Sequence, residues 1–159
     1  MPADAAIPAT QGCIADRLEH AVQQLRADLQ REGRGEDTTD PSRFSSESLA
    51  DVDGDGTPEH VLVEGFLGTA NNPHLLYLSN RGCVRYGGVV WAEAESLQVL
   101  PESKDGLRLL KAWGKNGCAG LAGTVMYLAW DGKRYVTSRE VHCGCPDETP
   151  GVPRDPECP

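Results

Sequence analysis

Residues 124–143, TVMYLAWDGKRYVTSREVHC, carry the clearest fold signal in the chain. Two runs rich in β-branched and aromatic residues, 124–130 and 133–143, flank the dipeptide Asp131-Gly132. An Asp-Gly pair between two such runs favours a tight type I′ turn, in which both turn residues have positive φ. The segment therefore predicts an antiparallel β-hairpin.

Further strand-like runs precede this hairpin. They are residues 60–66, 74–79, 83–91, 95–100 and 107–113. Turn-forming tripeptides at 80–82 (Asn-Arg-Gly) and 104–106 (Lys-Asp-Gly) separate two pairs of neighbouring runs. Strands that follow one another through such short connections are expected to form an antiparallel meander.

Residues 14–31 have the periodicity of an amphipathic helix. Apolar residues recur there every three or four positions and share one face; they are Ile14, Leu18, Val22, Leu25 and Leu29. Gly33 supplies a C-cap. The predicted fold class is therefore α+β, with this N-terminal helix packed on an antiparallel β-sheet, a meander of roughly five to seven strands stapled by disulfides.

The length of 159 residues favours a single domain. We expect a flexible N-terminus at 1–12, one α+β domain at 13–145, and a tail at 146–159. The tail is acidic and contains five prolines, so it is expected to run over the surface. Within the domain, 33–48 is polar and reads as a long exposed connection, anchored by Phe44.

The charge balance restricts the partners. Fifteen Lys and Arg against 24 Asp and Glu give a net charge of −9. Nucleic-acid binding is excluded, because a basic surface supplies most of that affinity. The sequence has no apolar run of 18 residues, so no membrane span is expected. An acidic surface instead suits a basic partner or a cation.

Six cysteines in so short a chain indicate disulfides and an oxidising compartment, so we expect a periplasmic or secreted protein. The candidates are Cys13, Cys83, Cys118, Cys143, Cys145 and Cys158. Sequence alone does not select a pairing, except that Cys143 and Cys145 lie too close to bond to each other. The first residues lack the basic and apolar regions of a signal peptide, so we expect that a leader was removed.

A zinc site is the alternative use of these cysteines. It would take His142, Cys143 and Cys145 together with Cys118. No CxxC pair or second histidine at ligand spacing accompanies them, so disulfides are favoured.

The stretch with the clearest chemistry is 51–59, DVDGDGTPE. Carboxylates at its first, third and fifth positions converge when the backbone curls, and its two glycines permit the positive φ that such curling needs. Hard oxygen ligands at this spacing suit Ca²⁺. The predicted ligands are Asp51, Asp53, Asp55, the backbone carbonyl of Thr57, and Glu59. Residue 62 is leucine where an EF-hand has its bidentate glutamate, so this is not an EF-hand. The alternative is a metal-free acidic turn, in which the aspartates would repel one another.

This loop resembles the calcium loop of FG-GAP/VCBS-type repeats, which has the form DxDxDGxx(D/E) and leads into a strand. The resemblance covers roughly residues 49–66 and implies the same five ligands for Ca²⁺. The sequence has no second DxDGDG loop, and a propeller needs repeated blades, so a full propeller is excluded. We therefore expect one calcium-loop hairpin in a small sheet, with a structural role for the ion.

The search for catalytic motifs indicates that the protein is not an enzyme. Its four histidines fall in no catalytic frame, and neither a GxSxG elbow nor a P-loop is present. Cys118 in the glycine-rich stretch 114–123 could serve as a hydrolase nucleophile. The even cysteine count favours a disulfide there instead.

The same glycine-rich stretch suggests a binding role. It lies between two strong strands, and bridging Cys118 would stiffen it, so Lys115, Asn116, Gly117 and Cys118 are candidate partner-binding residues. A rigid loop can plug a cleft because its ordering cost is already met. The alternative is a plain connection between strands.

These features predict a secreted or periplasmic calcium-binding protein that occludes a protein partner. In architecture it resembles periplasmic immunity proteins against type VI secretion amidases, which implies inhibition of a peptidoglycan-degrading enzyme. The alternative is a calcium-stabilised surface or adhesion module that binds carbohydrate or envelope components through Trp91, Trp113 or Trp130. The identity of the partner and a homodimer stay open.

Overall fold

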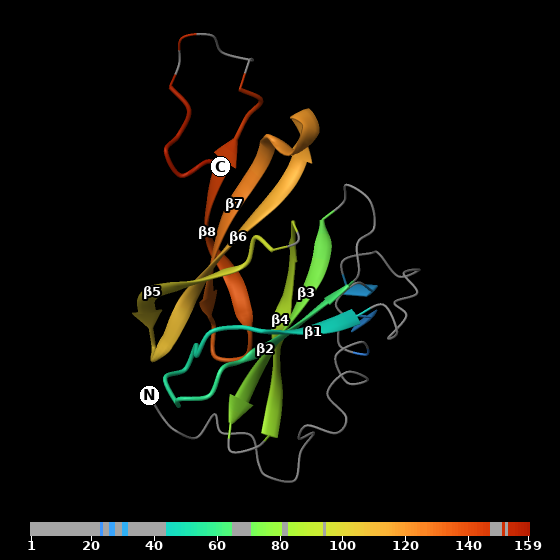
Figure 1. Cartoon of the computed structure of the whole chain (residues 1–159), viewed down its shortest axis with the longest axis vertical. Coiled ribbons are helices and arrows are strands. Elements are labelled where there is room, and N and C mark those ends of the chain that lie inside the picture. Colours follow the sequence, from blue (N-terminus) through green and yellow to red (C-terminus); the bar gives the residue numbers. More distant parts are fainter. Residues whose placement is uncertain are drawn as a thin grey trace.

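A computed structural model describes residues 44–64, 71–80, 83–93, 95–146, 151 and 153–159, together with 23, 26, 27, 30 and 31. The described chain is nearly all β, with two four-stranded antiparallel sheets (Figure 1). The predicted α+β fold, one helix on one sheet, is therefore wrong.

The first sheet has the order β1-β2-β3-β4, formed by β1 (Phe44–Ser48), β2 (His60–Glu64), β3 (Asn72–Asn80) and β4 (Cys83–Ala92). The second has the order β5-β6-β7-β8, formed by β5 (Gln98–Lys104), β6 (Leu107–Gly117), β7 (Ala122–Trp130) and β8 (Tyr135–Cys143). A short 3₁₀ turn, η4 (Cys118–Gly120), joins β6 to β7. Each sheet is a meander in which neighbours in sequence are neighbours in space.

All seven predicted strands are present, and an eighth was missed. β1 lies within the segment 33–48 that was predicted to be a connection. Its residues, FSSES, lack the apolar alternation of a strand, but they pair with β2 from Phe44 opposite Glu64 to Ser48 opposite His60. Pairing with a strongly apolar neighbour decides this strand, which local sequence did not reveal.

Most of the predicted helix at 14–31, with every apolar residue of its stripe, lies outside the described residues. Gln23, Arg26, Ala27, Gln30 and Arg31 are described; their backbone is helical and their side chains are exposed. The predicted N-terminal segment 1–12 and Cys13 also lie outside the described residues.

The predicted hairpin at 124–143 is confirmed, but its turn differs from the prediction. Trp130 pairs with Tyr135, which leaves a four-residue connection at 131–134. Gly132 has a φ of 104°, whereas Asp131 is not in the positive-φ region. The Asp131 carboxylate instead accepts the amides of residues 133 and 134 at 2.8 and 2.9 Å. Such side-chain capping satisfies the turn without the strained aspartate that type I′ requires.

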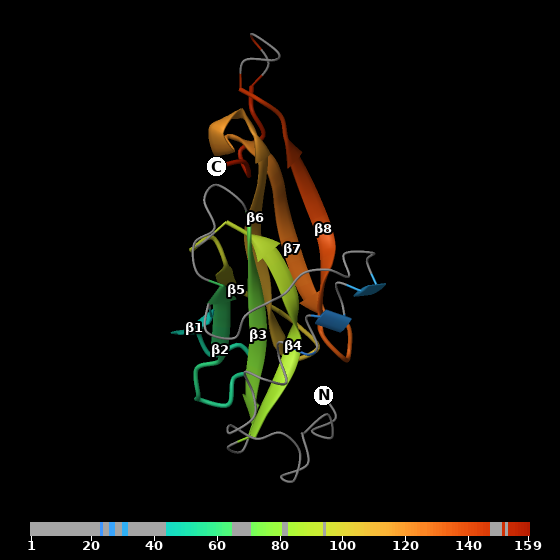
Figure 2. The ribbon, with the colours of Figure 1, turned by 90° about the vertical axis from the view of Figure 1, so that its right-hand side faces the viewer.

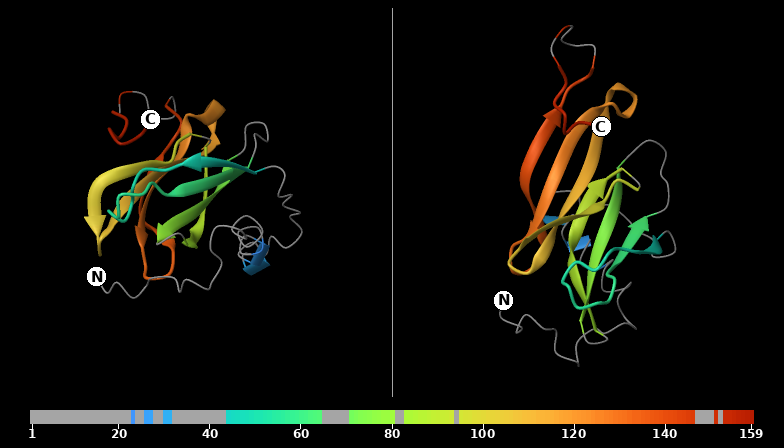
Figure 3. Two further views of the ribbon diagram at one scale, coloured as in Figure 1. Left: turned by 60° about the horizontal axis from the view of Figure 1, so that its bottom comes forward. Right: turned by 60° about the vertical axis from the view of Figure 1, so that its left-hand side comes forward.

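The main core lies between the two sheets (Figure 3). The first sheet contributes Val61, Val63, Leu76, Leu78 and Val90, and the second contributes Leu107, Leu110, Ala112, Leu128 and Trp130. Successive strand residues point to opposite faces, which explains why Val61 and Val63 face this core while Leu62 faces away. Both sheets therefore share one continuous core.

Each sheet also buries apolar side chains on its outer face. On the first sheet these are Leu62, Leu75 and Tyr77. On the second they are Trp113, Val125 and Cys143, against which Cys158 of the C-terminal segment packs. In Figure 2 the C-terminal segment lies at the end of the second sheet where β6 and β7 meet. Part of each outer face is therefore buried as well, which is why β3, whose side chains are buried on both faces, reads as a continuous apolar run.

Two disulfides fix this end of the molecule, Cys118–Cys145 and Cys143–Cys158. The prediction that Cys143 and Cys145 do not bond to each other is confirmed. The zinc alternative is wrong, because the three cysteines it requires are oxidised. Two disulfides indicate an oxidising, secreted environment. Among the described residues, no helix is long and apolar enough to cross a membrane.

Candidate metal centre and protruding tip

The acidic loop joins β1 to β2 and is built into the core. Its base is closed by the amide of Leu49, which donates to the carbonyl of Glu59 at 2.7 Å. Val52, in the middle of the loop, is 1% exposed and packs in the main core. Its carbonyl accepts the amide of Arg108 from β6 at 2.9 Å, and the Tyr135 hydroxyl of β8 donates to the carbonyl of Arg108. The loop is thereby tied to both sheets.

Backbone amides and aspartate carboxylates set the curl of this loop. The two oxygens of Asp51 accept the amides of Gly54 and Gly56 at 2.8 and 2.9 Å. Both glycines have the positive φ predicted for them, 78° and 87°. Asp53 and Asp55 each accept the amide two residues further on, at 3.1 and 2.7 Å. These contacts turn the chain back on itself.

Three carboxylates converge inside the curl. Asp51, Asp53 and Glu59 place ligand oxygens within 4.8 Å of one another, so the group could hold a metal ion. Glu59 is fully buried, and its Oε2 accepts the amide of Val52 at 2.7 Å. A buried carboxylate beside two others is unfavourable unless positive charge balances it.

The other two predicted ligands, Asp55 and Thr57, are exposed. The Asp55 carboxylate lies outside the group of three, and it accepts the amide of Thr57. The structure thus brings three of the four predicted carboxylates together.

The burial and the negative charge at this centre shift the pKa values of its own carboxylates and of a neighbouring tyrosine. Burial, with repulsion from Asp55, raises the pKa of Asp53 to about 6. Burial also acts to raise the pKa of Asp51, but its backbone hydrogen bonds outweigh this and hold that pKa below its usual value. The pKa of Tyr135 is raised, first by burial and then by the charges of Glu59 and Asp53. A divalent cation with hard-oxygen preference would relieve this concentration of negative charge.

The second candidate site is residues 116–121, the last two residues of β6 and the connection to β7, which we call the tip. In Figures 1 and 2 it lies near one end of the long axis, beside the C-terminal segment, and the acidic loop lies toward the opposite end. Asn116, Gly117 and Cys118 are exposed there. Lys115, also predicted to contact a partner, is held in the body: its ammonium lies 3.4 Å from Glu93, and its backbone bonds the Asn71 side chain.

The tip has an unusual backbone. Cys118, Ala119 and Gly120 have φ values of 48°, 54° and 87°, three left-handed residues in succession. The two that are not glycine each carry a strain of about 1 kcal/mol or more. The amide of Leu121 donates to the carbonyl of Cys118 at 3.1 Å, and the Cys118–Cys145 disulfide ties the turn to the end of β8. The strained turn is therefore closed by a covalent bond.

Leu121 is the residue that sequence reasoning missed. Its side chain is 51% exposed, and with Val136 at 37% it is one of two exposed large apolar residues of the described chain. A leucine in a glycine-rich loop carries no sequence signal for exposure. Only the pairing of β6 with β7 places it outside the body.

No match to known proteins was found. The chain matches no family model, no curated protein and no solved structure. The resemblances to FG-GAP/VCBS calcium loops and to amidase-immunity proteins therefore stay hypotheses that rest on residues 51–59 and on architecture.

Two alternatives from the sequence lose support. Cys118 is bonded to Cys145, so it is not a thiolate nucleophile in this structure. Trp113 and Trp130 are 7% and 8% exposed, and Trp91 packs beside the buried outer face of the first sheet. An aromatic platform for carbohydrate is therefore not formed by these tryptophans.

Proposed function

We propose that this protein is a calcium-stabilised, periplasmic or secreted binding protein that occludes a protein partner with the tip. The observation that carries the proposal is the exposed Leu121 on a backbone locked by a disulfide. Binding loses affinity when a loop must become ordered, and a covalently closed turn avoids that loss. An exposed apolar side chain on a rigid protrusion can enter an apolar pocket of a partner, where its burial would stabilise the complex.

The partner we propose is an enzyme that degrades peptidoglycan, an amidase in the first instance. A net charge of −9 would accelerate association with a basic enzyme through electrostatic steering. Occlusion requires no catalytic residue of this chain. The tip would enter the substrate cleft, and Leu121 would fill an apolar subsite.

We assign Ca²⁺ to the centre formed by Asp51, Asp53 and Glu59. Asp55, whose carboxylate lies outside this group here, and the Thr57 carbonyl would become further ligands when the ion binds. The donor set is all oxygen, and the buried Glu59 supports a dication there. Calcium would supply positive charge that holds the loop closed against both sheets. Because the loop and the tip lie toward opposite ends of the molecule, we give the ion a stabilising role and not a place in the partner interface (Figure 1).

Two matched variants test the proposal. The oxidised protein, immobilised, is exposed to envelope extract of its source cells, and the peptidoglycan-hydrolysing activity retained is measured. Leu121→Asp is expected to lower retention at least about tenfold, because it places a charge in an apolar contact. Val136→Asp, the other exposed apolar position, is expected to retain the wild-type amount.

Equal retention by the wild type and by Leu121→Asp would overturn the proposed role of the tip. Retention of glycan without any hydrolase would overturn the partner class. Each retention experiment is carried out once in Ca²⁺ and once in EGTA. Because we place the ion outside the partner interface, the folded protein is expected to retain the hydrolase in both conditions.

A further inference from the structure

We propose that the C-terminal segment 153–159, here called the brace, positions the tip through Arg154. This inference deepens the proposed function, because it names what holds the binding backbone in place. The brace meets the body at three points: an ion pair, a disulfide and a contact with the tip itself.

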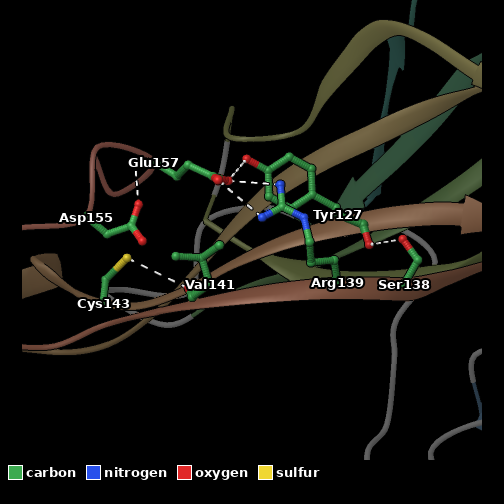
Figure 4. Close-up of polar contacts among 7 residues, drawn as sticks. All are labelled: Tyr127, Ser138, Arg139, Val141, Cys143, Asp155 and Glu157. Carbon is green, nitrogen blue, oxygen red and sulfur yellow. Dashed lines mark hydrogen bonds and ion pairs between the residues drawn. The ribbon is translucent and has the colours of Figure 1, made fainter.

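The first point is a cluster around Glu157, drawn in Figure 4. Arg139 of β8 donates to both oxygens of Glu157, at 3.2 and 3.0 Å. The Tyr127 hydroxyl of β7 donates to the same carboxylate, and the Arg139 guanidinium stacks 3.9 Å from the Tyr127 ring. A bidentate pair that is also stacked fixes position and orientation together. Glu157 is thereby held at one place on the outer face of the second sheet.

The second point is covalent. Cys158 bonds to Cys143 at the end of β8 and packs beside the cluster of Trp113 and Val125. Asp155 closes a tight turn between the anchors, since its carbonyl accepts the amide of Cys158 at 3.0 Å and its carboxylate accepts the amide of residue 157 at 2.8 Å. The brace is therefore a rigid turn fixed to the sheet.

The third point reaches the tip. Arg154 directly precedes the fixed turn, and its guanidinium donates to the backbone carbonyl of Leu121. Arg154 is partly buried, and its Nε has no hydrogen-bond partner among the described residues. The contact restrains the C-terminal side of the tip, while Cys118–Cys145 restrains its N-terminal side.

Two contacts therefore tie the tip to other segments, a covalent one at Cys118 and a polar one at Leu121. Removing Arg154 leaves the disulfide and both sheets intact, yet it frees the carbonyl next to the exposed Leu121 side chain. Arg154 is a positioning residue, and the measurable consequence is the mobility of the tip backbone.

Backbone ¹⁵N relaxation of the full oxidised chain tests this without any partner. In the wild type, residues 119–121 are expected to have order parameters near about 0.85, and Arg154→Met lowers them below about 0.6. Arg154→Lys keeps one donor and is expected to restore most of the order. Lys133→Met, the same change of charge in the connection between β7 and β8, leaves residues 119–121 unchanged.

Unchanged order parameters at 119–121 in Arg154→Met would overturn the proposal that the brace positions the tip. A parallel loss of order in the central part of β7 would also overturn it, since that would be general destabilisation. The two proposals fail separately. If Leu121→Asp abolishes retention of the hydrolase while Arg154→Met leaves the tip rigid, the brace is wrong and the proposed function stands. If Arg154→Met loosens the tip but Leu121→Asp binds normally, the proposed function is wrong and the brace stands.

Discussion

Replacing Asp53 by asparagine should have opposite effects on stability with and without calcium. Without metal, the Asp53 carboxylate is partly buried near Asp51, Asp55 and Glu59, and its pKa of about 6 reports the unfavourable charge. A shift of that size would equal about 3 kcal/mol in a fully buried group, and solvent screening reduces it here to about 1 kcal/mol. Asp53→Asn should therefore stabilise the metal-free protein by about 1 kcal/mol at pH 7.5, or roughly 2–4 °C in Tm.

With calcium bound, the wild type should instead be more stable than Asp53→Asn. A ligand at one hundred times its Kd adds about 2.7 kcal/mol, which raises the Tm of the wild type by roughly 5–11 °C. Asp53→Asn loses a charged ligand and should gain far less. The assay is thermal unfolding in 1 mM EGTA and at about one hundred times the measured Kd for Ca²⁺.

Asp105→Asn is the matched control. Asp105 lies in the exposed turn between β5 and β6 with a φ of 54°, a conformation that asparagine also tolerates. It removes the same charge and should shift Tm by less than about 1 °C in either condition. Our reasoning would be refuted if the wild type had the same Tm in Ca²⁺ and in EGTA, or if Asp53→Asn behaved like this control.

Three further predictions concern the core, the tip and association. Burial holds the pKa of His74 below its ordinary value, against the opposing effects of hydrogen bonds to the backbone of Asn72 and Val90 and of the Glu47 charge, so the folded state favours the neutral ring. The stability that comes from the neutral His74 ring is therefore fully present above pH ~6.5, and it decreases as the pH falls below that value, by at most about 1.4 kcal/mol per pH unit. Urea unfolding at pH 7.5 and 5.5 measures this decrease. An equal pH dependence in His74→Leu would contradict the prediction. Gly123→Ala should lower the free energy of unfolding by about 1–3 kcal/mol in denaturant unfolding, because its Cβ would lie 2.1 Å from the Gly114 carbonyl oxygen. In the control Gly117→Ala, the new Cβ would meet only a side chain at 4.0 Å, so the free energy of unfolding should change little. The association rate with a basic hydrolase should fall at least about tenfold between low and high salt, and a rate independent of salt would exclude steering by the acidic surface.

Most of the strands were predictable because their signals are local. The runs that became β2 to β4 and β6 to β8 contain alternating or continuous apolar residues between turn-forming residues, and pairing did not have to be known. The division into two sheets was not predictable in this way. It occurs at 93–97, where Glu95 adopts a φ of 65° and the amide of Glu93 donates to the carbonyl of Trp113 at 2.7 Å. That contact joins residues 20 positions apart, and no turn motif marks it.

The acidic loop was also predictable, because spacing alone brings Asp51 and Asp53 together and the glycines allow the curl. The burial of Glu59 was not predictable from the sequence, since Glu59 bonds the amide of Val52, and Val52 packs in the core between the two sheets. The contact of Arg154 with Leu121 joins residues 33 positions apart. Long-range contacts of this kind depend on the assembled sheets and leave no local pattern.

The most direct test of occlusion by the tip is a titration of peptidoglycan hydrolysis. The hydrolase retained from envelope extract is purified, and its release of soluble fragments is followed as the oxidised protein is added. We predict that activity falls to zero at about one equivalent, and that Leu121→Asp requires at least about tenfold more protein. Undiminished hydrolysis at a tenfold excess of wild-type protein would contradict the proposed function.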